Sequence, residues 1–419
     1  MSEAGMSGTG MSEARLYRVA LPMRIGFDHP AARRSTSDSL VLRLESDGAS
    51  GIGECAPRAY VTGETSDGVV AALRRIPMEK LFERIRSLPP AELLGQLHED
   101  GFAATFGIDG GNNLICLLET AVLDLIGHRL GVGAGELLPV PDRPVPDRPA
   151  PVPPASLPVS QVLDLSIGAE EFLDSRGPFH FVKIKASDDI ERDVRTVTAI
   201  RDRLGDGVPL MVDANMSWTE GNAVANARRL RACGVDQVEE PLPRRSWDGL
   251  RALRRATGIG VMLDESVCTL DDARTAIAAQ ACDAVNVRVA KNGGLLNAAR
   301  IVDHARAGGT AFQIGVQVAE TGPLINAGRA LAFRSPGALT VEAGQSDRFF
   351  PEMIVSPRPV VDRRTNTVAP AGGHGFGMRL NGAAEPWAVL VHREGRDPGW
   401  YPAPAAPRTP APGQPLTTR

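Results

Sequence analysis

The stretch Phe181-Val182-Lys183-Ile184-Lys185-Ala186 decides how the rest of the chain is interpreted. Side chains two residues apart on a β-strand point to the same face, so Lys183 and Lys185 share one face. If Val182 and Ile184 pack against outer helices, both ammonium groups point toward the interior or the mouth of a barrel. Two cations about 6 Å apart, at an effective dielectric near 20, repel each other by roughly 3 kcal/mol, on the order of two pKa units. Such repulsion makes a lysine a usable base near neutral pH, whereas two solvated lysines on an edge strand would do no chemistry.

The surroundings of this stretch favour a barrel. From residue 159 onward, short apolar strands alternate with amphipathic helical stretches, in about eight βα units. The candidate strands are residues 159–165, 181–186, 209–214, 237–240, 260–264, 284–289, 311–317 and 339–342. A doubly wound open sheet is the alternative, but no Gly-x-Gly-x-x-Gly follows an early strand, so a dinucleotide site lacks its usual loop.

The chain before the barrel is predicted to be an α+β segment, residues 15–138. Its candidate strands are 16–23, 39–45 and 51–54, with a loop at 24–38, and its candidate helices are 68–76, 78–88, 90–98 and 113–130. The last of these helices has the broadest apolar face.

The remaining segments are predicted from their composition. Residues 1–14 are expected to be a disordered leader and residues 399–419 a disordered, proline-rich tail. Residues 139–158 repeat Pro-Val-Pro-Asp-Arg, which favours a polyproline II linker that cannot join a sheet. The barrel is expected over residues 159–365, and residues 366–398 contain one more strand-like piece.

Bulk properties exclude several classes of protein. The net charge of −4 and the lack of a basic patch argue against nucleic acid and anionic membranes as partners. Five scattered cysteines without Cys-x-x-Cys spacing indicate a reducing compartment. The first 15 residues lack the apolar core region of a signal peptide, and no apolar run approaches the length of a membrane span. We therefore expect a cytoplasmic protein.

Acidic residues close three successive candidate strands. Asp213 stands in Val-Asp-Ala-Asn, Glu239 in Val-Glu-Glu-Pro and Asp264 in Leu-Asp-Glu-Ser. Their spacings of 26 and 25 residues match one βα unit each, so the carboxylates converge at the barrel mouth. An uncompensated trio is destabilising and implies a hard divalent cation, with Mg²⁺ favoured over Zn²⁺ for all-oxygen ligands and Mn²⁺ as an alternative.

These motifs, followed by Asn-Val-Arg-Val-Ala-Lys-Asn-Gly-Gly at 286–294, resemble the enolase superfamily. The nearest branch is the muconate-lactonizing enzyme, o-succinylbenzoate synthase and dipeptide epimerase group of the mandelate racemase/muconate lactonizing enzyme family. The resemblance covers roughly residues 15–395. It implies a modified (β/α)7β TIM-type barrel, with an α+β capping domain formed by the N-terminal segment and the C-terminal end.

The resemblance also implies a small-molecule carboxylate substrate whose α-proton is removed to give a Mg²⁺-stabilised enolate. It implies that the metal ligands are Asp213, Glu239 and Asp264, that Lys185 is the base, and that Lys183 neutralises charge. The residues that would support the metal ligands are Asn215, Glu240 and Glu265. The residues that would contact the substrate are Thr62, Glu64 and Arg24. Candidates for specificity at the ends of strands one and eight are Leu163, Leu165, Glu342, Asp347 and Arg348. A homo-oligomer is expected.

One position departs from the family pattern. A second catalytic lysine normally stands two residues after Asn286, and here that residue is Arg288. Guanidinium stays protonated, so Arg288 is a poor proton donor or acceptor and a good electrostatic clamp. Lys291 would substitute if the backbone turned it inward, but it could equally be an exposed loop lysine. Residues 313–317 offer no histidine base.

This departure favours a one-base cycloisomerase or lyase such as a dehydratase, with Lys185 giving and taking the proton. An epimerase or racemase of an amino acid derivative or dipeptide, using Lys185 and Lys291, is the first alternative. A non-catalytic binding protein on the same fold and a Schiff-base aldolase are the others, although an aldolase would not need three strand-end carboxylates.

Overall fold

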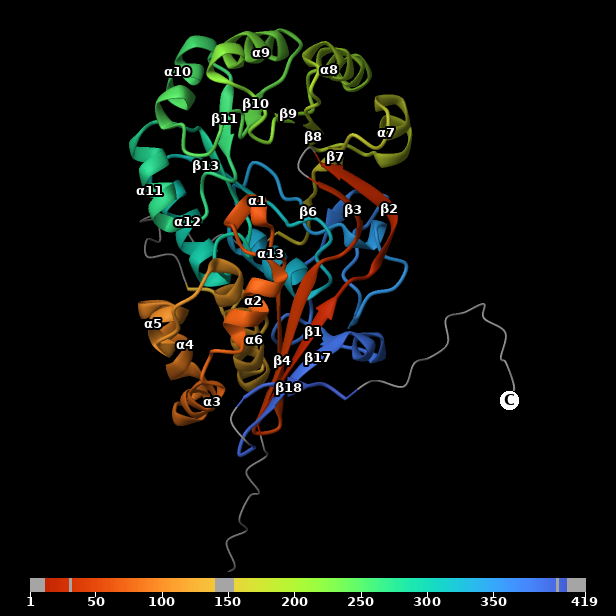
Figure 1. Ribbon diagram of the computed structural model, residues 1–419. Helices are drawn as coiled ribbons and strands as arrows, with labels where there is room; N and C mark the ends of the chain where they lie inside the picture. The colour runs from red at the N-terminus through yellow and green to blue at the C-terminus, as the bar shows by residue number, and fades with distance from the viewer. Residues whose placement is uncertain (1–11, 30–31, 140–153, 397–398, 405–419) are drawn as a thin grey trace, which may run out of the picture.

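A computed structural model describes residues 12–29, 32–139, 154–396 and 399–404, without side chains for 27–33. Within this part of the chain, a barrel packs against a capping region that consists of an antiparallel sheet and several helices (Figure 1). No helix of the described residues is long and apolar enough to cross a membrane. The predicted leader, linker and tail lie mostly outside the described residues.

The barrel wall is a parallel sheet in the order β13-β12-β11-β10-β9-β8-β7. Its strands are β7 Gln161–Leu163, β8 Val182–Lys185, β9 Leu210–Asp213, β10 Gln237–Glu239, β11 Gly260–Leu263, β12 Ala284–Val287 and β13 Ala311–Ile314. The eighth predicted strand is a single parallel bridge between Val341 and Ile314. The Ser160 backbone N donates to Val341 O at 3.0 Å, which joins this last segment to the first strand and closes the barrel.

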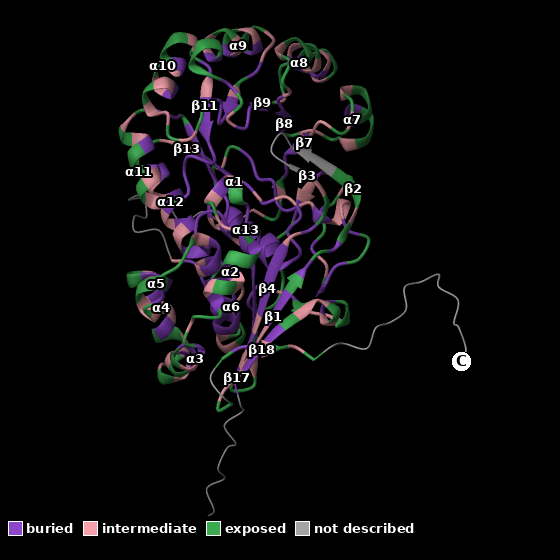
Figure 2. Cartoon of the chain, in the orientation of Figure 1, coloured by how far each residue is buried: buried purple, intermediate pink, exposed green. Residues whose placement is uncertain are grey.

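Helices cover the outside of the barrel, and most of them turn an apolar face inward and a charged face to solvent (Figure 2). They are α7 Ala169–Arg176, α8 Ile190–Leu204, α9 Glu220–Ala232, α10 Trp247–Thr257, α11 Leu270–Ala278, α12 Leu295–Ala307 and α13 Pro323–Arg334. This strand–helix alternation confirms the predicted (β/α)7β fold class.

Strand periodicity sets the contents of the barrel interior. Inward side chains at one end form an apolar layer of Phe181, Met211, Met262 and Ala284. Two residues further along β8 and β9, the same inward face carries Lys183 and Asp213. The apolar layer therefore fills one end of the barrel, and the charged residues gather at the carboxyl ends of the strands.

The cap is a five-stranded antiparallel sheet in the order β18-β17-β1-β4-β5. Its strands are β18 Tyr401–Pro402, β17 Ala388–Arg393, β1 Glu13–Val19, β4 Ser39–Ser46 and β5 Ala49–Cys55. The helices of this part are α1 Ala59–Thr62, α2 Ser66–Leu73, α3 Met78–Ser87, α4 Pro90–Asp100, α5 Phe102–Phe106 and α6 Asn112–Leu130. Because β1 pairs with both β4 and β17, the two ends of the chain meet in one sheet.

Helix α6 lies directly on β5. The apolar residues of α6 face nearly all directions and are buried, and the helix ends at Gly131, whose φ of 71° is the left-handed conformation that glycine favours. A Cβ at Gly51 would stand 2.3 Å from Ala121 O, and one at Gly53 2.3 Å from Leu117 O. The two glycines therefore let the helix approach the strand.

Three sequence predictions were wrong in detail. The predicted loop 24–38 contains a hairpin, β2 Pro22–His29 with β3 Ala32–Thr36. The predicted linker was expected not to join a sheet, but its last two residues, Leu157–Pro158 (β6), pair with β15 Thr367–Val368. An edge strand allows this pairing, because proline lacks the backbone N–H donor but keeps its carbonyl acceptor. Tyr401–Pro402 (β18), which lies in the predicted proline-rich tail, joins the cap sheet. The buried Trp400 beside it supplies apolar contacts, which the prediction from proline content did not consider.

The remaining short elements are β14 Val355–Ser356, β16 Arg379–Leu380, η1 Ser346–Arg348 and η2 Gly382–Trp387. Strands β14 and β16 form a two-stranded sheet after the barrel. The segment η1 follows the last barrel segment and contributes to the wall of the cavity described below.

Candidate active site

The carboxyl ends of β8 to β13 form a buried, charged cluster. Register pairs Lys185 with Asp213 on one side and Asp213 with Glu239 on the other. Asp213, Glu239 and Asp264 are wholly buried. The structure therefore brings together the three carboxylates that the spacing predicts.

Lys183 lies at the centre of this cluster. Its Nζ stands 2.6 Å from Glu239 Oε2, 3.1 Å from Glu342 Oε1 and 3.3 Å from Asp213 Oδ2. Burial lowers the pKa of Lys183, but the charges of Glu239, Glu342 and Asp213 outweigh it and leave the pKa well above its ordinary value. In this arrangement Lys183 is an ammonium group that neutralises carboxylates, rather than a group whose pKa is depressed by the neighbouring lysine.

Lys185 has fewer partners than Lys183. Its Nζ donates to Asp213 Oδ2 at 2.5 Å and to Asn215 Oδ1 at 3.1 Å. Both lysines also line the cavity at the barrel mouth. A lysine that faces a cavity and is held from one side is placed to reach a bound substrate.

The two cations at β12 differ sharply in position. Arg288 lines the cavity, and its guanidinium contacts the Asp264 carboxylate and donates to Gln317 Oε1 at 3.3 Å. Lys291 is wholly buried, and its Nζ donates to Asp264 Oδ1 at 2.9 Å and to the backbone O of Asp264 and of Asn286, both at 2.7 Å. Lys291 is thus neither the exposed loop lysine nor the cavity-facing lysine that the sequence allowed.

The charge of the cluster fits a divalent cation. Six buried carboxylates at the strand ends, Asp213, Glu239, Glu240, Asp264, Glu265 and Glu342, face four buried cations, Lys183, Lys185, Arg288 and Lys291. Six minus four leaves two negative charges when all are ionised. Burial and the charge of Asp213 raise the pKa of Glu239 to about 7, in keeping with this excess.

The supporting carboxylates are also buried. Glu240 accepts backbone N–H groups of Asp264 at 2.7 Å and of Ser266 at 3.1 Å, and burial raises its pKa to about 7. Glu265 keeps one carboxylate oxygen without a hydrogen bond, and burial followed by the charge of Asp264 raises its pKa well above the ordinary value.

The donor set suits Mg²⁺ or Mn²⁺, because all of it is oxygen. As the side chains stand, no three His, Cys, Asp or Glu groups among the described residues are arranged to hold a metal ion. The nitrogens of Lys183 and Arg288 contact the carboxylate oxygens instead. Metal binding would therefore require these cations to give way at the carboxylates.

Three of the predicted substrate contacts lie elsewhere. Thr62 Oγ1 and Glu64 Oε2 accept from Asn113 Nδ2 at 3.1 and 2.8 Å, so both residues hold the N-terminus of α6. Arg24 is exposed and donates to the Phe350 carbonyl at 3.2 Å. The polar side chains of these three residues form hydrogen bonds with nearby backbone or helix-end groups, and none of the three residues lines the cavity.

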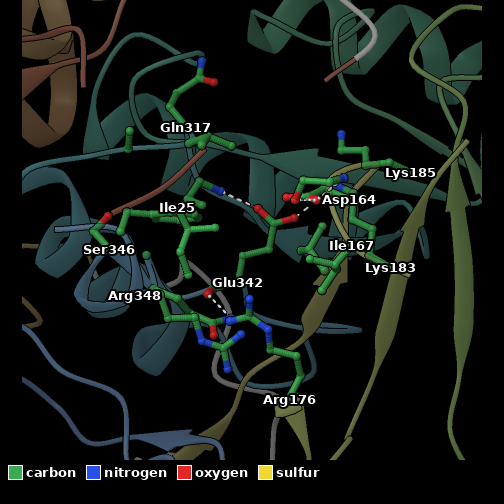
Figure 3. Close-up of a pocket in the computed structure, with 18 of the residues that line it drawn as sticks. Ile25, Asp164, Ile167, Arg176, Lys183, Lys185, Gln317, Glu342, Ser346 and Arg348 are labelled. Atoms are coloured by element: carbon green, nitrogen blue, oxygen red, sulfur yellow. Dashed lines mark hydrogen bonds and ion pairs between the residues drawn. The ribbon is translucent and has the colours of Figure 1, made fainter. Parts of the chain in front are cut away.

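The cavity wall includes residues that the sequence analysis missed. Tyr60, a neighbour of a predicted contact, lines it. Ile25, which follows the predicted contact Arg24, also lines it, as do Asp164, Arg176 and Gln317 (Figure 3). Asp164 follows β7 directly, so a strand-end rule could have found it. Arg176 is the last residue of α7, and no sequence signal places a helix end at the mouth of a barrel. Glu342 does line the cavity, with its carboxylate held by Lys183 and by Val316 N at 2.8 Å.

Comparisons with known proteins agree with this geometry. Residues 164–384 match the family model described as Enolase C-terminal domain-like. The chain is 28% identical over 302 residues to the L-Ala-D/L-Glu epimerase of Bacillus subtilis, covering 71% of this chain and 78% of that protein. It is 32% identical over 353 residues to the N-succinylamino acid racemase of an Amycolatopsis species, covering 83% and 89%.

Solved structures share the fold. The dipeptide epimerase of Enterococcus faecalis, complexed with Mg and the dipeptide L-Leu-L-Tyr, superposes with a TM-score of 0.74 at 22% identity, covering 88% of this chain and 99% of that one. The muconate lactonizing enzyme of Pseudomonas putida gives a TM-score of 0.73 at 24% identity, covering 90% and 98%. The family match, the barrel with its cap and the strand-end carboxylates lead to one conclusion: this chain belongs to the enolase superfamily, in its mandelate racemase/muconate lactonizing enzyme family.

Proposed function

We propose that this protein removes the α-proton of a carboxylate substrate with Lys185 as the base, in a one-base cycloisomerisation or elimination. The observation that carries the proposal is the composition of the cavity wall. Lys183, Lys185 and Arg288 line the cavity, whereas the wholly buried Lys291 is not among the described residues that do. One candidate base, Lys185, therefore faces the cavity beside the charge-neutralising Lys183.

Each residue has a role that follows from its contacts. Lys185, hydrogen-bonded to Asp213 and Asn215, is oriented by two oxygens and takes the proton. Lys183 supplies a permanent positive charge, because three carboxylates hold it in the ammonium form. Arg288 supplies a second one on the wall, where a guanidinium steadies an anion without moving a proton.

Asp213, Glu239 and Asp264 are the groups that would hold Mg²⁺. A bound divalent ion stabilises the second negative charge that develops on the substrate carboxylate when the α-proton leaves. The excess of two carboxylates over cations in the buried cluster supports this assignment, and so does the Mg in the related epimerase structure.

A second candidate function is epimerisation or racemisation, because the curated relatives described above are an epimerase and a racemase. It requires a proton donor on the opposite face of the carbanion. The position where the family pattern expects the second lysine carries Arg288, which lines the cavity, and Lys291 makes three hydrogen bonds inside the protein. The geometry therefore favours the one-base reaction.

The experiment is α-proton exchange in D₂O with Mg²⁺, followed by NMR on N-succinyl-L-phenylalanine, L-Ala-L-Glu and muconolactone, the last carrying a CH₂ group α to its carboxylate whose proton a base removes when the ring opens. We expect turnover or exchange of one of these compounds by the wild type. Loss of the base should lower its rate by about 10²–10⁴-fold in Lys185→Ala, the usual contribution of a general base. The exposed Lys80→Ala is the matched control and should keep the wild-type rate. An active Lys185→Ala would contradict the proposal.

Oligomeric state and cellular location are also proposals. We propose a homo-oligomer in the cytoplasm, supported by the five free and scattered cysteines for the location and by the family resemblance for the assembly. Light scattering at several concentrations tests the first point, and fractionation of the source cells tests the second.

A further inference from the structure

Arg58 is a deeply buried arginine at the boundary between the cap and the barrel. It directly precedes helix α1, and only 2% of its surface is exposed. Its guanidinium makes three hydrogen bonds, all to backbone carbonyls. Nη1 donates to Pro57 O at 2.8 Å and to Asp38 O at 2.9 Å, both in the cap. Nη2 donates to Val318 O at 2.9 Å, in the barrel, so the two arms of one guanidinium join the two parts of the molecule.

The buried charge of Arg58 is costly. Burial lowers the pKa of Arg58 to about 10, so the guanidinium is still charged at neutral pH. Among the residues that the structure describes, no carboxylate forms an ion pair with it. An apolar side chain of similar size would fill the space without the cost of removing a charge from water. Stability alone therefore does not explain an arginine at this position.

The acceptor of Arg58 in the barrel belongs to a loop of the cavity wall. Residues 316–319 follow β13, and all four line the cavity. Ala319 has a φ of 70°, a backbone conformation that a residue other than glycine rarely adopts. Val318, whose carbonyl Arg58 holds, stands directly before it. Arg58 thus fixes loop 316–319 next to its strained residue.

Gln317 connects this loop to Arg288. Gln317 Oε1 accepts from Arg288 Nη1 at 3.3 Å, and the Arg288 guanidinium also contacts the Asp264 carboxylate. The backbone N of Gln317 donates to Oε1 of Glu320, the residue after the loop, at 2.8 Å. Movement of loop 316–319 would therefore displace the amide that orients one arm of Arg288.

A second residue of the cap holds the chain just beyond this loop. Glu54 accepts the backbone N–H groups of Thr321 at 2.6 Å and of Gly322 at 3.0 Å. Glu54 thus binds donors at the start of α13, whereas Arg58 binds a carbonyl of the cavity wall. The two contacts differ in what they fix, because only the contact of Arg58 lies within the loop that carries Gln317.

We propose that Arg58 is a positioning residue for the reaction. Its Nη2 arm holds Val318 O and thereby keeps loop 316–319, with the Gln317 amide, in the place where it orients Arg288. Arg58 is not among the residues that line the cavity, so it acts through the loop. The effect on catalysis rests on the proposed function, and the proposal adds a residue of the cap on which the geometry of the cavity wall depends.

The first test measures the loop itself and requires no substrate. Hydrogen–deuterium exchange mass spectrometry of the full chain follows the backbone amides of residues 313–321. Loss of a buried hydrogen bond from a charged donor should speed amide exchange in this segment about 10-fold or more in Arg58→Met. The control is Arg201→Met, which should leave the segment unchanged. Arg201 also donates to three backbone carbonyls, but these precede β9 and β10 at the amino ends of the strands, and they are those of Gly205, Val208 and Gly234.

The second test is a double-mutant cycle with Gln317→Ala, scored as kcat/KM for α-proton exchange. Arg58→Met should lower kcat/KM about 10- to 100-fold in the wild-type background, the cost of a small displacement in a site. In the Gln317→Ala background it should lower kcat/KM less than about 3-fold, since the side chain that Arg58 positions is already absent. Arg58→Lys keeps the charge, but its single nitrogen cannot reach acceptors on both sides, so it should resemble Arg58→Met.

Unchanged amide exchange in both Arg58 variants would overturn the proposal. Equal fold losses of kcat/KM in the two backgrounds would also overturn it, because Arg58 would then not act through Gln317. Wild-type behaviour of Arg58→Lys would contradict it as well, since charge alone would then suffice. If Arg58→Met fails to fold, Arg58→Lys carries the same predictions. Faster amide exchange in Arg58→Met, in a protein whose wild type exchanges no α-proton, would uphold the contact with the loop and count against the proposed function.

Discussion

At the scale of single residues, Arg288 is the position on which the reaction type depends. It lines the cavity where related sequences are expected to carry a lysine, and its guanidinium contacts Asp264. Arg288→Lys would place a second group able to exchange a proton on that wall. We predict that inversion of an L-configured substrate rises by about 10²–10⁴-fold over the wild type, as general acid–base catalysis provides.

Chiral chromatography of the recovered substrate measures this inversion. The control is Arg288→Gln, which removes the positive charge without adding a group that transfers protons. If Arg288→Lys and Arg288→Gln give the same stereochemical outcome, Arg288 does not face the α-carbon.

The residue scale also shows what a sequence can reveal about a site. Strand periodicity and one βα unit of spacing placed Lys183, Lys185, Asp213, Glu239 and Asp264 in one cluster, because strand ends meet at one mouth. The same rules could not place Lys291, since its burial depends on the carbonyls of Asp264 and Asn286, which its own strand does not specify. The substrate role predicted for Glu64 came from the family resemblance instead, and in the structure Glu64 accepts hydrogen bonds from Asn113 at the start of α6.

At the scale of elements, two carboxylates of the cap dock on helices of the barrel. Glu54 of β5 accepts the backbone N–H groups of Thr321 at 2.6 Å, Gly322 at 3.0 Å and Leu324 at 3.2 Å, at the start of α13. Glu119 of α6 accepts the Leu296 N–H at 3.0 Å, at the start of α12. Helix N-termini favour negative charge, so both contacts join the cap to the barrel.

We predict that Glu54→Gln lowers the free energy of unfolding by about 1–3 kcal/mol, because the side-chain NH₂ group of glutamine would face the buried backbone N–H groups that the carboxylate now accepts. Urea denaturation of the variant measures the change. Glu92→Gln, at an exposed position on α4, is the control and should stay within about 0.5 kcal/mol of the wild type. Equal stability of both variants would show that the Glu54 contacts do not hold the cap in place.

Helix α6 also carries a group that couples stability to pH. Asp124 accepts the Ile52 N–H at 2.8 Å, and burial raises its pKa from the ordinary 3.8 to about 7. Between these two pH values the folded state binds more protons than the unfolded state, so stability falls as pH rises through this window. Below pH 4 and above pH 7 the contribution of Asp124 is constant.

The prediction is a difference between Asp124→Asn and the wild type. The wild type should lose up to about 1.4 kcal/mol more per pH unit than the variant between pH 4 and pH 7. Urea midpoints measured at pH 4, 5, 6, 7 and 8 give the slope. Parallel curves for the two proteins would show that Asp124 titrates at its ordinary pKa in the folded state.

At the scale of the whole molecule, barrel and cap share one apolar core, and the buried charge collects at the barrel mouth. The alternation of strands and helices made the barrel predictable, because each βα unit repeats the same pattern. The closure of the cap by β18 and the hairpin β2–β3 were missed, since short edge strands have weak periodicity and depend on distant partners.

The charge at the mouth predicts a stabilising metal. Mg²⁺ at 100 times its dissociation constant should raise the free energy of unfolding by about 2.7 kcal/mol, and EDTA should reverse the gain. Thermal unfolding with and without Mg²⁺ measures the effect. Glu239→Gln should abolish it, while Glu92→Gln should keep it. A stabilisation that survives in Glu239→Gln would place the metal elsewhere.

The central claim is that Lys185 is the one group that moves the α-proton, and the stereochemistry of exchange tests it most directly. The wild type is incubated with N-succinyl-L-phenylalanine and Mg²⁺ in D₂O, and recovered L and D isomers are separated and analysed for deuterium by mass spectrometry. The account predicts deuterium in the recovered L isomer, no accumulation of the D isomer, and no exchange in Lys185→Ala. Deuterated D isomer forming as fast as the L isomer exchanges would contradict it, because a second group would then deliver protons from the opposite face.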